Sequence, residues 1–396
     1  MIKMKTGLFK KMVAVPVALL LPISALMCAG GGIDGSGFRS QGPITGFGSI
    51  IVNGTELDTQ RVAVVINGQT VGIGDDAVLG NLAVGQVVTV EGKTRGSSDG
   101  IIAQKVFYNS SVKGPVESVV EIDPLTKQIV VMGQSVIINT ATQFNATSFD
   151  TISPNDTLEV SGLFDDTATL WATFIKSVGT FTPGMQVELE GYITNLDTFA
   201  QRFEVNNLIV DYALADTSGL TGGIKEGLLI EVSGTLNAVS DPLQATRIRP
   251  GDDLDDADVD QIEVIGFVTD FISSAEFMVG NLMVQTDSGT QFVDGTAADV
   301  ALGVKLEAEG RLEAGVLTAT EVEFWGPGQI EIEGLVTDFT SVNEFKIGEQ
   351  VVRPDSQTVF EGLDPVDLAE GLNLEIKGVP IDIERSAILA DKVSLE

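Results

Sequence analysis

The amino-acid composition leaves few kinds of catalytic chemistry open to this chain. Its 396 residues include no histidine and a single cysteine, Cys28. The lack of histidine excludes Ser-His-Asp and Cys-His catalysis and removes the commonest general base and metal ligand. One cysteine can form neither an internal disulfide nor a cysteine-ligated zinc or iron–sulfur site. An enzyme would therefore depend on a glycosidase-type pair of carboxylates or on a Ser/Lys arrangement.

Carboxylates are abundant, with 56 Asp and Glu residues, but their spacing favours a structural interpretation. Several of them alternate with apolar residues along short runs: Glu188, Glu190, Glu307, Glu309, Glu331 and Glu333. A period of two places such residues on one face of a β-strand. We therefore expect these carboxylates to form a solvated strand face, and we predict that the protein is not an enzyme.

The densest acidic segment is a candidate calcium site. Its six aspartates are Asp252, Asp253, Asp255, Asp256, Asp258 and Asp260. Their oxygens are ligands that calcium prefers, but the spacing lacks the central glycine and the bidentate glutamate of an EF-hand loop. The alternative, which we favour, is a charged and extended linker between two domains. The sequence indicates no other cofactor.

Glycine spacing reveals a five-fold internal repeat of about 70 residues, which has to be recognised before any fold is assigned. Five positions each stand seven residues before a second glycine: Gly85, Asn155, Gly227, Gly303 and Gly371 precede Gly92, Gly162, Gly234, Gly310 and Gly378. The first position is predicted to have a positive φ angle, which glycine adopts freely and asparagine tolerates best among the other residues. The second glycine is predicted to end or to bend the strand at a barrel corner.

Each repeat is predicted to form five short strands, with a short helical segment before the fourth strand. The strands alternate apolar and polar residues and are rich in Val, Ile, Phe and Thr. This order resembles the five-stranded OB-fold barrel, whose closure removes exposed strand edges. Two sets of phenylalanines recur at equivalent positions, which favours barrel core over a ligand-stacking platform: Phe203, Phe277 and Phe345, and Phe144, Phe292 and Phe360. The fold class is therefore all-β, with five tandem small OB-like β-barrels; small β-sandwich repeats are the alternative.

The repeats divide the chain into consecutive segments. These are a signal peptide at 1–28, a Gly-rich tether at 29–41, barrel repeats at 42–109, 110–180 and 181–250, an acidic linker at 251–261, and barrel repeats at 262–326 and 327–396. The repeats are longer than those of most solenoids. We therefore expect five separate small cores arranged as beads in a row.

The N-terminal residues resemble an export signal. Lys3, Lys5 and two further lysines precede an apolar stretch from Met12 to Ile23 that is too short to span a membrane comfortably. Cys28 follows, before a glycine run suited to a flexible tether. Its position resembles the lipidated cysteine of a bacterial lipoprotein, although Met27 stands where a small residue is usual. The alternative is an ordinary cleaved signal with an incidental cysteine.

The net charge narrows the classes of partner. The chain carries −33 at neutral pH, whereas nucleic-acid binding requires a basic surface that neutralises phosphates. A strongly negative charge keeps an exported protein soluble. The sequence therefore predicts no nucleic-acid partner, whatever the OB-like fold suggests by analogy.

Several of these residues resemble a known family. The run from Gly42 through Pro43 to Gly54, the five Gly-x-x-Leu/Val-x-Leu/Val-x-Gly-like strands and their Ala-x-x-Val/Ile endings resemble bacterial envelope proteins built from repeats of domain of unknown function 5666. The resemblance implies an exported, often lipid-anchored, all-β protein of unknown activity. It supplies no catalytic residues.

Together these observations predict a binding or structural repeat module of the bacterial cell envelope. We expect it to be anchored to the outer membrane through Cys28, or otherwise periplasmic or secreted, with a partner that is an envelope protein or a glycan. The alternative is an acidic extracellular hydrolase that uses a carboxylate pair in one repeat or in a cleft. No repeat shows an unmatched carboxylate cluster in its sequence.

Overall fold

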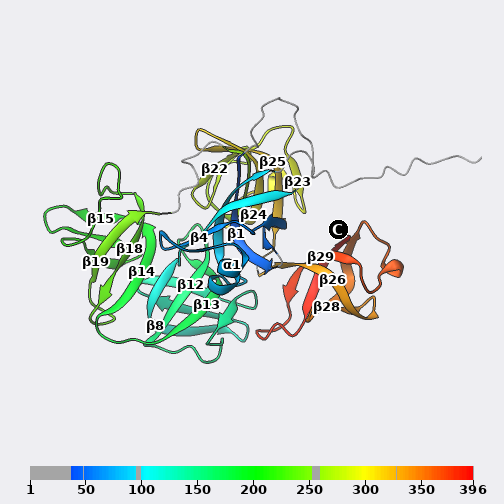
Figure 1. Ribbon diagram of the computed structural model, residues 1–396, viewed down its shortest axis with the longest axis horizontal. Coiled ribbons are helices and arrows are strands. Elements are labelled where there is room, and N and C mark those ends of the chain that lie inside the picture. Colours follow the sequence, from blue (N-terminus) through cyan, green and yellow to red (C-terminus); the bar gives the residue numbers. More distant parts are fainter. Residues whose placement is uncertain (1–36, 48, 95–99, 252–258, 327, 396) are drawn as a thin grey trace, which may run out of the picture.

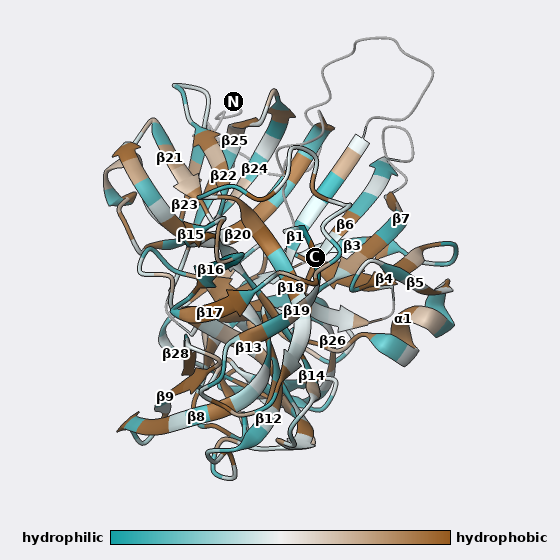
Figure 2. Ribbon diagram, turned by 90° about the vertical axis from the view of Figure 1, so that its left-hand side faces the viewer, coloured by the Kyte–Doolittle hydropathy of each residue, from teal (hydrophilic) through white to brown (hydrophobic). Residues whose placement is uncertain are grey.

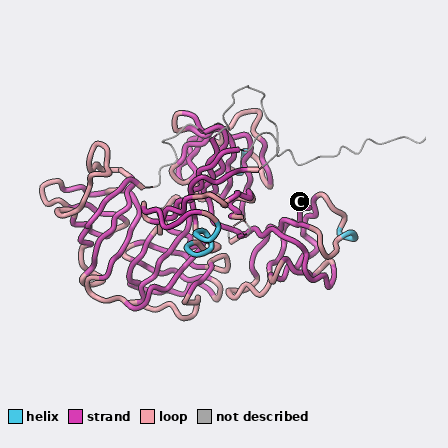
Figure 3. The backbone as a smooth tube through the Cα atoms, viewed as in Figure 1, coloured by secondary structure: helices cyan, strands magenta, loops and turns pink. Residues whose placement is uncertain are grey.

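A computed structural model describes residues 37–47, 49–94, 100–251, 259–326 and 328–395. The predicted signal peptide, the tether up to residue 36 and most of the acidic linker lie outside these ranges. The described chain is almost entirely β-structure (Figure 3). Within the described ranges, one short α-helix and two single-turn 3-10 helices accompany the strands. The all-β prediction is confirmed.

The last repeat shows the barrel in its simplest form. Its strands are β26 (Ile330–Ser341), β27 (Glu344–Ile347), β28 (Gln350–Glu361), β29 (Asn373–Pro380) and β30 (Ile388–Leu395). Hydrogen bonding runs in the closed order β26-β27-β28-β30-β29. A 3-10 turn at Pro365–Asp367 precedes β29, where the sequence predicts a helical segment. We call this unit barrel 5.

Barrels 4, 2 and 1 repeat the same cycle of pairings. Barrel 4 comprises β20 (Val259–Ser273), β21 (Glu276–Val279), β22 (Leu282–Gln285), β23 (Gln291–Val293), the 3-10 turn Ala297–Asp299, β24 (Lys305–Glu313) and β25 (Val316–Trp325). Barrel 2 comprises β8 (Val112–Asp123), β9 (Thr126–Val131), β10 (Gln134–Ile138), β11 (Gln143–Asn145), β12 (Asp156–Phe164) and β13 (Leu170–Thr180). Barrel 1 comprises β1 (Gly37–Phe47), β2 (Ile50–Val52), β3 (Thr55–Asp58), β6 (Val87–Thr94) and β7 (Ile101–Tyr108). Between β3 and β6 it has an additional hairpin of β4 (Ala63–Ile66) and β5 (Gln69–Ile73), which is followed by helix α1 (Asp75–Asn81).

Barrel 3 differs in its first strand, which is divided at Ile193. Its strands are β14 (Met185–Tyr192), β15 (Thr194–Asp197), β16 (Arg202–Val205), β17 (Leu208–Asp211), β18 (Leu229–Leu236) and β19 (Leu243–Pro250). β14 pairs with β18 and β15 with β16, so the two halves together occupy the place of one bent first strand. The OB-like order of strands is thus retained in all five repeats.

The glycine interval has the predicted backbone geometry. All five first positions have positive φ angles, from 72° at Asn155 to 91° at Gly85. All five second glycines lie at a register shift between the fourth and fifth strands. At Gly310 an added Cβ would stand 2.1 Å from the Thr318 carbonyl oxygen on the paired strand. The second glycine of each interval, which we call the closing glycine, therefore permits a β-bulge that bends the strand, as predicted, and does not end it.

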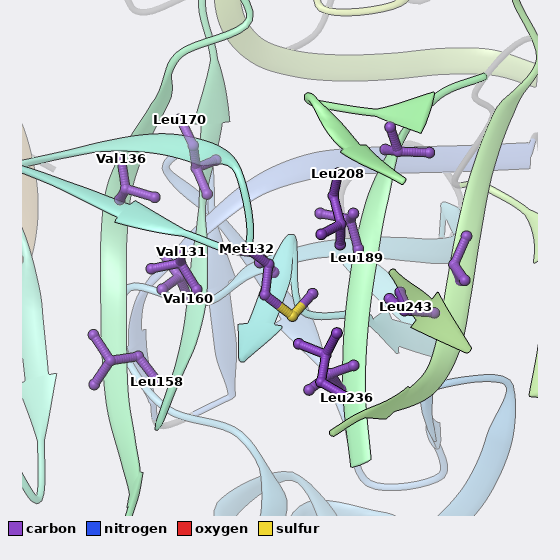
Figure 4. Close-up of a cluster of buried hydrophobic side chains, with 14 of the residues drawn as sticks. Val131, Met132, Val136, Leu158, Val160, Leu170, Leu189, Leu208, Leu236 and Leu243 are labelled. Carbon is purple, nitrogen blue, oxygen red and sulfur yellow. The ribbon is translucent and has the colours of Figure 1, made fainter. Parts of the chain in front are cut away.

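The barrel interiors contain the first set of recurring phenylalanines. Phe203, Phe277 and Phe345 are at most 1% exposed, which confirms them as core. The second set, which includes Phe144 and Phe292, is partly buried at the barrel ends. Barrels 2 and 3 share one continuous core cluster. Figure 4 shows the Met132 side chain between Val160 of barrel 2 and Leu236 of barrel 3.

The barrels are joined by strand pairing, so the expectation of beads in a row with five separate cores is wrong. β1 pairs in parallel with β20, with Gln41 opposite Val264, which joins barrels 1 and 4 in one 13-stranded sheet although barrels 2 and 3 lie between them in the sequence. β8 pairs with β14, which joins barrels 2 and 3 in a 12-stranded sheet. Figure 2 shows β21, β22, β24, β20 and β1 side by side, and Figure 1 shows barrel 5, in orange and red, beside the other four. The barrels form one assembled body.

Candidate binding site

The assembly of barrels 1 to 4 forms a partly open cavity of about 390 Å³, which we call the junction cavity. Every one of these four barrels contributes to its lining. This volume lies within the range of roughly 300–1,000 Å³ that small-molecule sites occupy. The cavity exists because outward-facing surfaces of separate barrels meet. No single repeat could form it.

The interior of the cavity is mostly apolar. Its aliphatic lining includes Val88 of β6, Leu163 of β12, Val264 and Ile265 of β20, and Leu229 of β18. Val88 and Val264 are also part of the cores of their own barrels and are almost fully buried. The cavity walls are therefore continuous with packed barrel interiors, which hold them in place.

Barrels 3 and 4 present equivalent segments to the cavity. Each contributes the glycine that opens its repeat, Gly191 or Gly266, and an asparagine from the turn after its second strand, Asn206 or Asn281. A Cβ on Gly191 would stand 2.7 Å from the Val205 side chain, so glycine is required for the turn to pack against the first strand. Asn206 Nδ2 then donates to the Glu190 carbonyl oxygen at 3.2 Å. Scaffold features of the repeat thus shape this side of the cavity.

The charged side chains that line the cavity are all acidic: Asp165, Asp166, Glu190 and Asp270. Asp165 Oδ2 accepts from Trp171 Nε1 at 2.8 Å, and its Oδ1 accepts from the backbone of Thr167 and Thr169 at 2.9 and 3.0 Å. Burial alone would raise the pKa of Asp165, but the hydrogen bonds from Trp171 and Thr167 lower it below its ordinary value. The cavity therefore carries fixed negative charge at neutral pH.

Aromatic side chains accompany these carboxylates. Phe107 of β7, Phe164 of β12 and Tyr192 of β14 line the cavity, and the Tyr192 side chain is about half exposed. Aromatic faces beside an acidic and apolar cavity can contact either hydrocarbon or a positively charged group. The arrangement can bind and orient a small ligand.

A second concentration of carboxylates covers the outer face of barrel 4. The strand register places Glu263 opposite Glu309, and Glu309 opposite Glu321. The neighbouring row places Glu307 opposite Glu323. Like charges directly opposite in a sheet are destabilising. We call these five side chains the carboxylate ladder.

The prediction of a solvated strand face is wrong for this part of the chain. Glu263, Glu307 and Glu331 are 2%, 5% and 6% exposed because neighbouring barrels cover them. Gly54 of barrel 1 lies beside the Glu331 carboxylate. A Cβ atom added at Gly54 would be 3.2 Å from Glu331 Oε1. The carboxylates are outward with respect to their barrels, as the period-two pattern requires, but barrels 1 and 5 exclude water from them.

Lysines offset part of this negative charge. Lys377 Nζ lies 3.4 Å from Glu331 Oε2 and also forms an ion pair with Glu323. Lys392 Nζ lies 3.2 Å from Glu361 and 3.9 Å from Glu323. Lys305 and Lys377 both stand over the Trp325 ring, 4.8 and 4.6 Å from its centroid. Barrel 5 is therefore docked on barrel 4 through buried charge.

Burial alters proton binding in the ladder. Burial, with a smaller contribution from Glu321, raises the pKa of Glu309 to about 7. Burial and the nearby Glu309 carboxylate raise the pKa values of Glu263 and Glu307 well above the ordinary range. Burial lowers the pKa of Lys305 to about 8. Within the described ranges, no group of three or more Asp, Glu or Cys residues has a metal-binding arrangement.

Most of the predicted site residues lie outside the described chain. Cys28, Asp252, Asp253, Asp255, Asp256 and Asp258 are among them. Asp260 lies in β20, where its Oδ1 is 3.8 Å from Arg311 Nε in an exposed ion pair. Among the residues placed by the structure, no helix has the length and hydropathy needed to cross a membrane.

Sequence reasoning missed the junction cavity because its residues come from four repeats and share no motif. Glu190 alternates with apolar residues as solvated strand residues do, Asp165 and Asp166 lie at the turn after β12, where acidic residues are common, and Asp270 lies within the long strand β20. One sequence feature did mark this site: the spacing between Asp165 and Trp171 occurs in no other repeat. Its meaning depends on how the barrels dock.

Comparison with known proteins agrees with the repeat structure. The family described as Domain of unknown function (DUF5666) matches the chain five times in tandem, at residues 41–106, 113–176, 190–249, 265–323 and 333–393. Each match spans the five-strand cycle of one barrel. No curated protein matches the chain.

Proposed function

We propose a function from the premise that this chain belongs to the DUF5666 family, whose domain it carries five times. The protein is an exported, lipid-anchored envelope protein that binds a small organic ligand in the junction cavity. The observation that carries this proposal is the cavity itself, which four docked barrels build and which a row of independent barrels would lack. The five-fold repeat serves as the scaffold.

The form of the cavity supports binding over a purely structural role. An apolar interior with a few polar groups at defined positions is typical of ligand sites. The partner is an envelope component, of glycan or protein origin, that carries the bound group.

A ligand-retention experiment tests the proposal. The chain is incubated with a detergent extract of the source envelope, re-isolated, and analysed by mass spectrometry for molecules that remain bound. Met278, which lines the cavity from β21, is replaced in the variant Met278→Trp to fill the space. The matched control is Lys346→Trp at the equivalent position of β27 in barrel 5, outside the cavity.

We expect the native chain and the Lys346→Trp control to retain the same small molecule and the Met278→Trp variant to lose it. Loss from both variants would point to general destabilisation, which a melting curve of each protein detects. Retention by Met278→Trp at the native level would contradict binding in the cavity. An empty native chain after exposure to the extract would contradict the proposal as well.

The envelope location rests on the N-terminal sequence. The basic start, the short apolar stretch and Cys28 support export with lipid attachment to the cysteine. A single lipid-modified cysteine would bind the membrane without a membrane-spanning segment. We expect Cys28→Ser to release the protein into the soluble fraction of lysed cells. Full persistence of this variant in the membrane fraction would contradict lipid anchoring.

A further inference from the structure

The charge of the junction cavity identifies the class of ligand. Carboxylates reach it from three barrels: Asp165 and Asp166 from barrel 2, Glu190 from barrel 3, and Asp270 from barrel 4. No lysine or arginine is among the lining residues that the structure describes. Barrels that are distant in sequence thus place charge of one sign around a single space, within a chain whose net charge is already −33.

The interior favours a hydrocarbon body beside that charge. Leu163, Leu229 and Ile265 form part of an apolar lining that a fully hydrated ion would not fill. Phe164 and Tyr192 add aromatic surface, to which a positively charged group is attracted through the ring face. A ligand that matches both features has a cationic head and a compact apolar body.

We propose that the junction cavity binds an organic cation, an amine or quaternary ammonium group attached to an apolar body. This inference rests on the proposed function, because it requires the cavity to be a ligand site. The apolar body occupies the space beside Leu163 and Ile265. The cationic head lies near Glu190 and Asp270, with the Tyr192 ring beside it.

Asp165 makes the negative charge of the site permanent. Four hydrogen bonds from Trp171, Thr167 and Thr169 hold its carboxylate in one orientation. The same bonds lower its pKa, so the group stays ionised in mildly acidic surroundings. A preorganised charge of this kind favours a cation without the cost of reorganising the side chain on binding.

The same features exclude other ligand classes. A phosphate or carboxylate ligand would meet only like charge in the lining. A metal ion would need at least three oxygen ligands converging on one point, and the described residues form no such group. A neutral ligand such as a sugar would fit the aromatic surface and could donate hydrogen bonds to the carboxylates, but it would leave their negative charge uncompensated.

Three probes that share an octyl chain separate these possibilities. Octyltrimethylammonium, octyl glucoside and octanoate carry a positive, a neutral and a negative head, and calorimetric titration of the full chain measures the affinity for each. The variant is Glu190→Gln with Asp270→Asn. The repeat supplies a matched control in Glu333→Gln with Asp338→Asn, because these residues occupy the equivalent positions of barrel 5 and do not line the cavity.

We expect the ammonium probe to bind most tightly and octanoate least tightly. The cavity variant should lose on the order of tenfold in affinity for the ammonium probe, because two partly exposed charge pairs each contribute a few-fold. The control variant should bind as the native chain does. Higher salt should weaken binding of the ammonium probe and leave that of octyl glucoside unchanged.

The outcomes distinguish this inference from the proposed function beneath it. Equal binding of all three probes, abolished by Met278→Trp, would retain the cavity as a ligand site and overturn the cationic ligand. Equal loss of ammonium binding in the cavity variant and in the barrel 5 control would also overturn it, because the effect would then come from net charge. Absence of binding by every probe would contradict the inference, while the extract experiment would still decide the proposed function.

Discussion

Single residues at the barrel corners show how the sequence specifies backbone geometry. The position that opens the fourth strand has a positive φ angle in all five repeats, and Asn155 meets the same demand as the four glycines. The closing glycine answers a different demand, which is space beside the carbonyl of the paired strand. Residue type and spacing predicted the positive φ angle and a bend or an end at the second glycine, but not the close approach of the paired strand's carbonyl.

The closing glycine gives a prediction with an internal control. Gly310→Ala should lower the free energy of unfolding by roughly 2–4 kcal/mol, because the new methyl group would overlap the Thr318 carbonyl oxygen on the paired strand. Gly80→Ala in helix α1 has open space around it and should raise stability by up to about 1 kcal/mol. Urea titration of both variants measures the difference. Equal effects would contradict the role assigned to the bulge.

Glu309 gives a prediction about pH. Its pKa is raised from 4.5 to about 7 by burial, so the folded state holds a proton that the unfolded state has released. Stability from this group is therefore fully present below its ordinary pKa of 4.5 and lost as pH rises through about 7. Relative to Glu309→Gln, which cannot ionise, the native chain should lose on the order of 2 kcal/mol between these limits.

Denaturation at several pH values measures this difference between native chain and variant. The control is Glu313→Gln on the same strand, whose side chain is 68% exposed and which should show no such trend. A difference between the native chain and Glu309→Gln that does not change with pH would show that Glu309 is hydrated and not buried by barrel 5 and barrel 1.

At the scale of elements, the strand pairings that close each barrel all lie within one repeat. Barrel 5 has a closed ring of five strands and a separate core cluster centred on Phe345, Ile376 and Val393. The strand order, the core phenylalanines and the short helical segments of barrels 1, 4 and 5 were predictable because they depend on contacts within one repeat. The helical segment expected before the fourth strand is not found in the described residues of barrels 2 and 3, where turns occupy its place. The additional hairpin of barrel 1 and the divided first strand of barrel 3 were not, because no other repeat shares them.

The independence of barrel 5 is testable. Residues 327–396 expressed alone should fold and melt cooperatively, because the ring and the core are complete within this segment. Circular dichroism and a thermal melt measure this. Val393→Asp, which places a charge in the core, should abolish the transition. A disordered spectrum for the unaltered segment would mean that barrel 5 depends on the buried charges that dock it to barrel 4.

At the scale of the whole molecule, the docking of the barrels creates buried carboxylates and a cavity that the repeat pattern does not predict. Glu307 and Glu331 alternate with apolar residues as solvated strand residues do, yet neighbouring barrels bury them. Periodicity reports which side of a strand faces the barrel interior, and it carries no information on what covers the other side. The junction cavity was unpredictable for the same reason, since Leu163 and Val264 come together only in the assembled body.

The assembled arrangement of the barrels is the central claim, because the cavity and the buried carboxylates both require it. Small-angle X-ray scattering of the full chain tests it directly. Docked barrels predict a radius of gyration of roughly 20–25 Å, whereas five barrels in an extended row would give about 40 Å. A value near the lower range, unchanged by moderate salt, is the predicted result. A value near 40 Å would contradict the account.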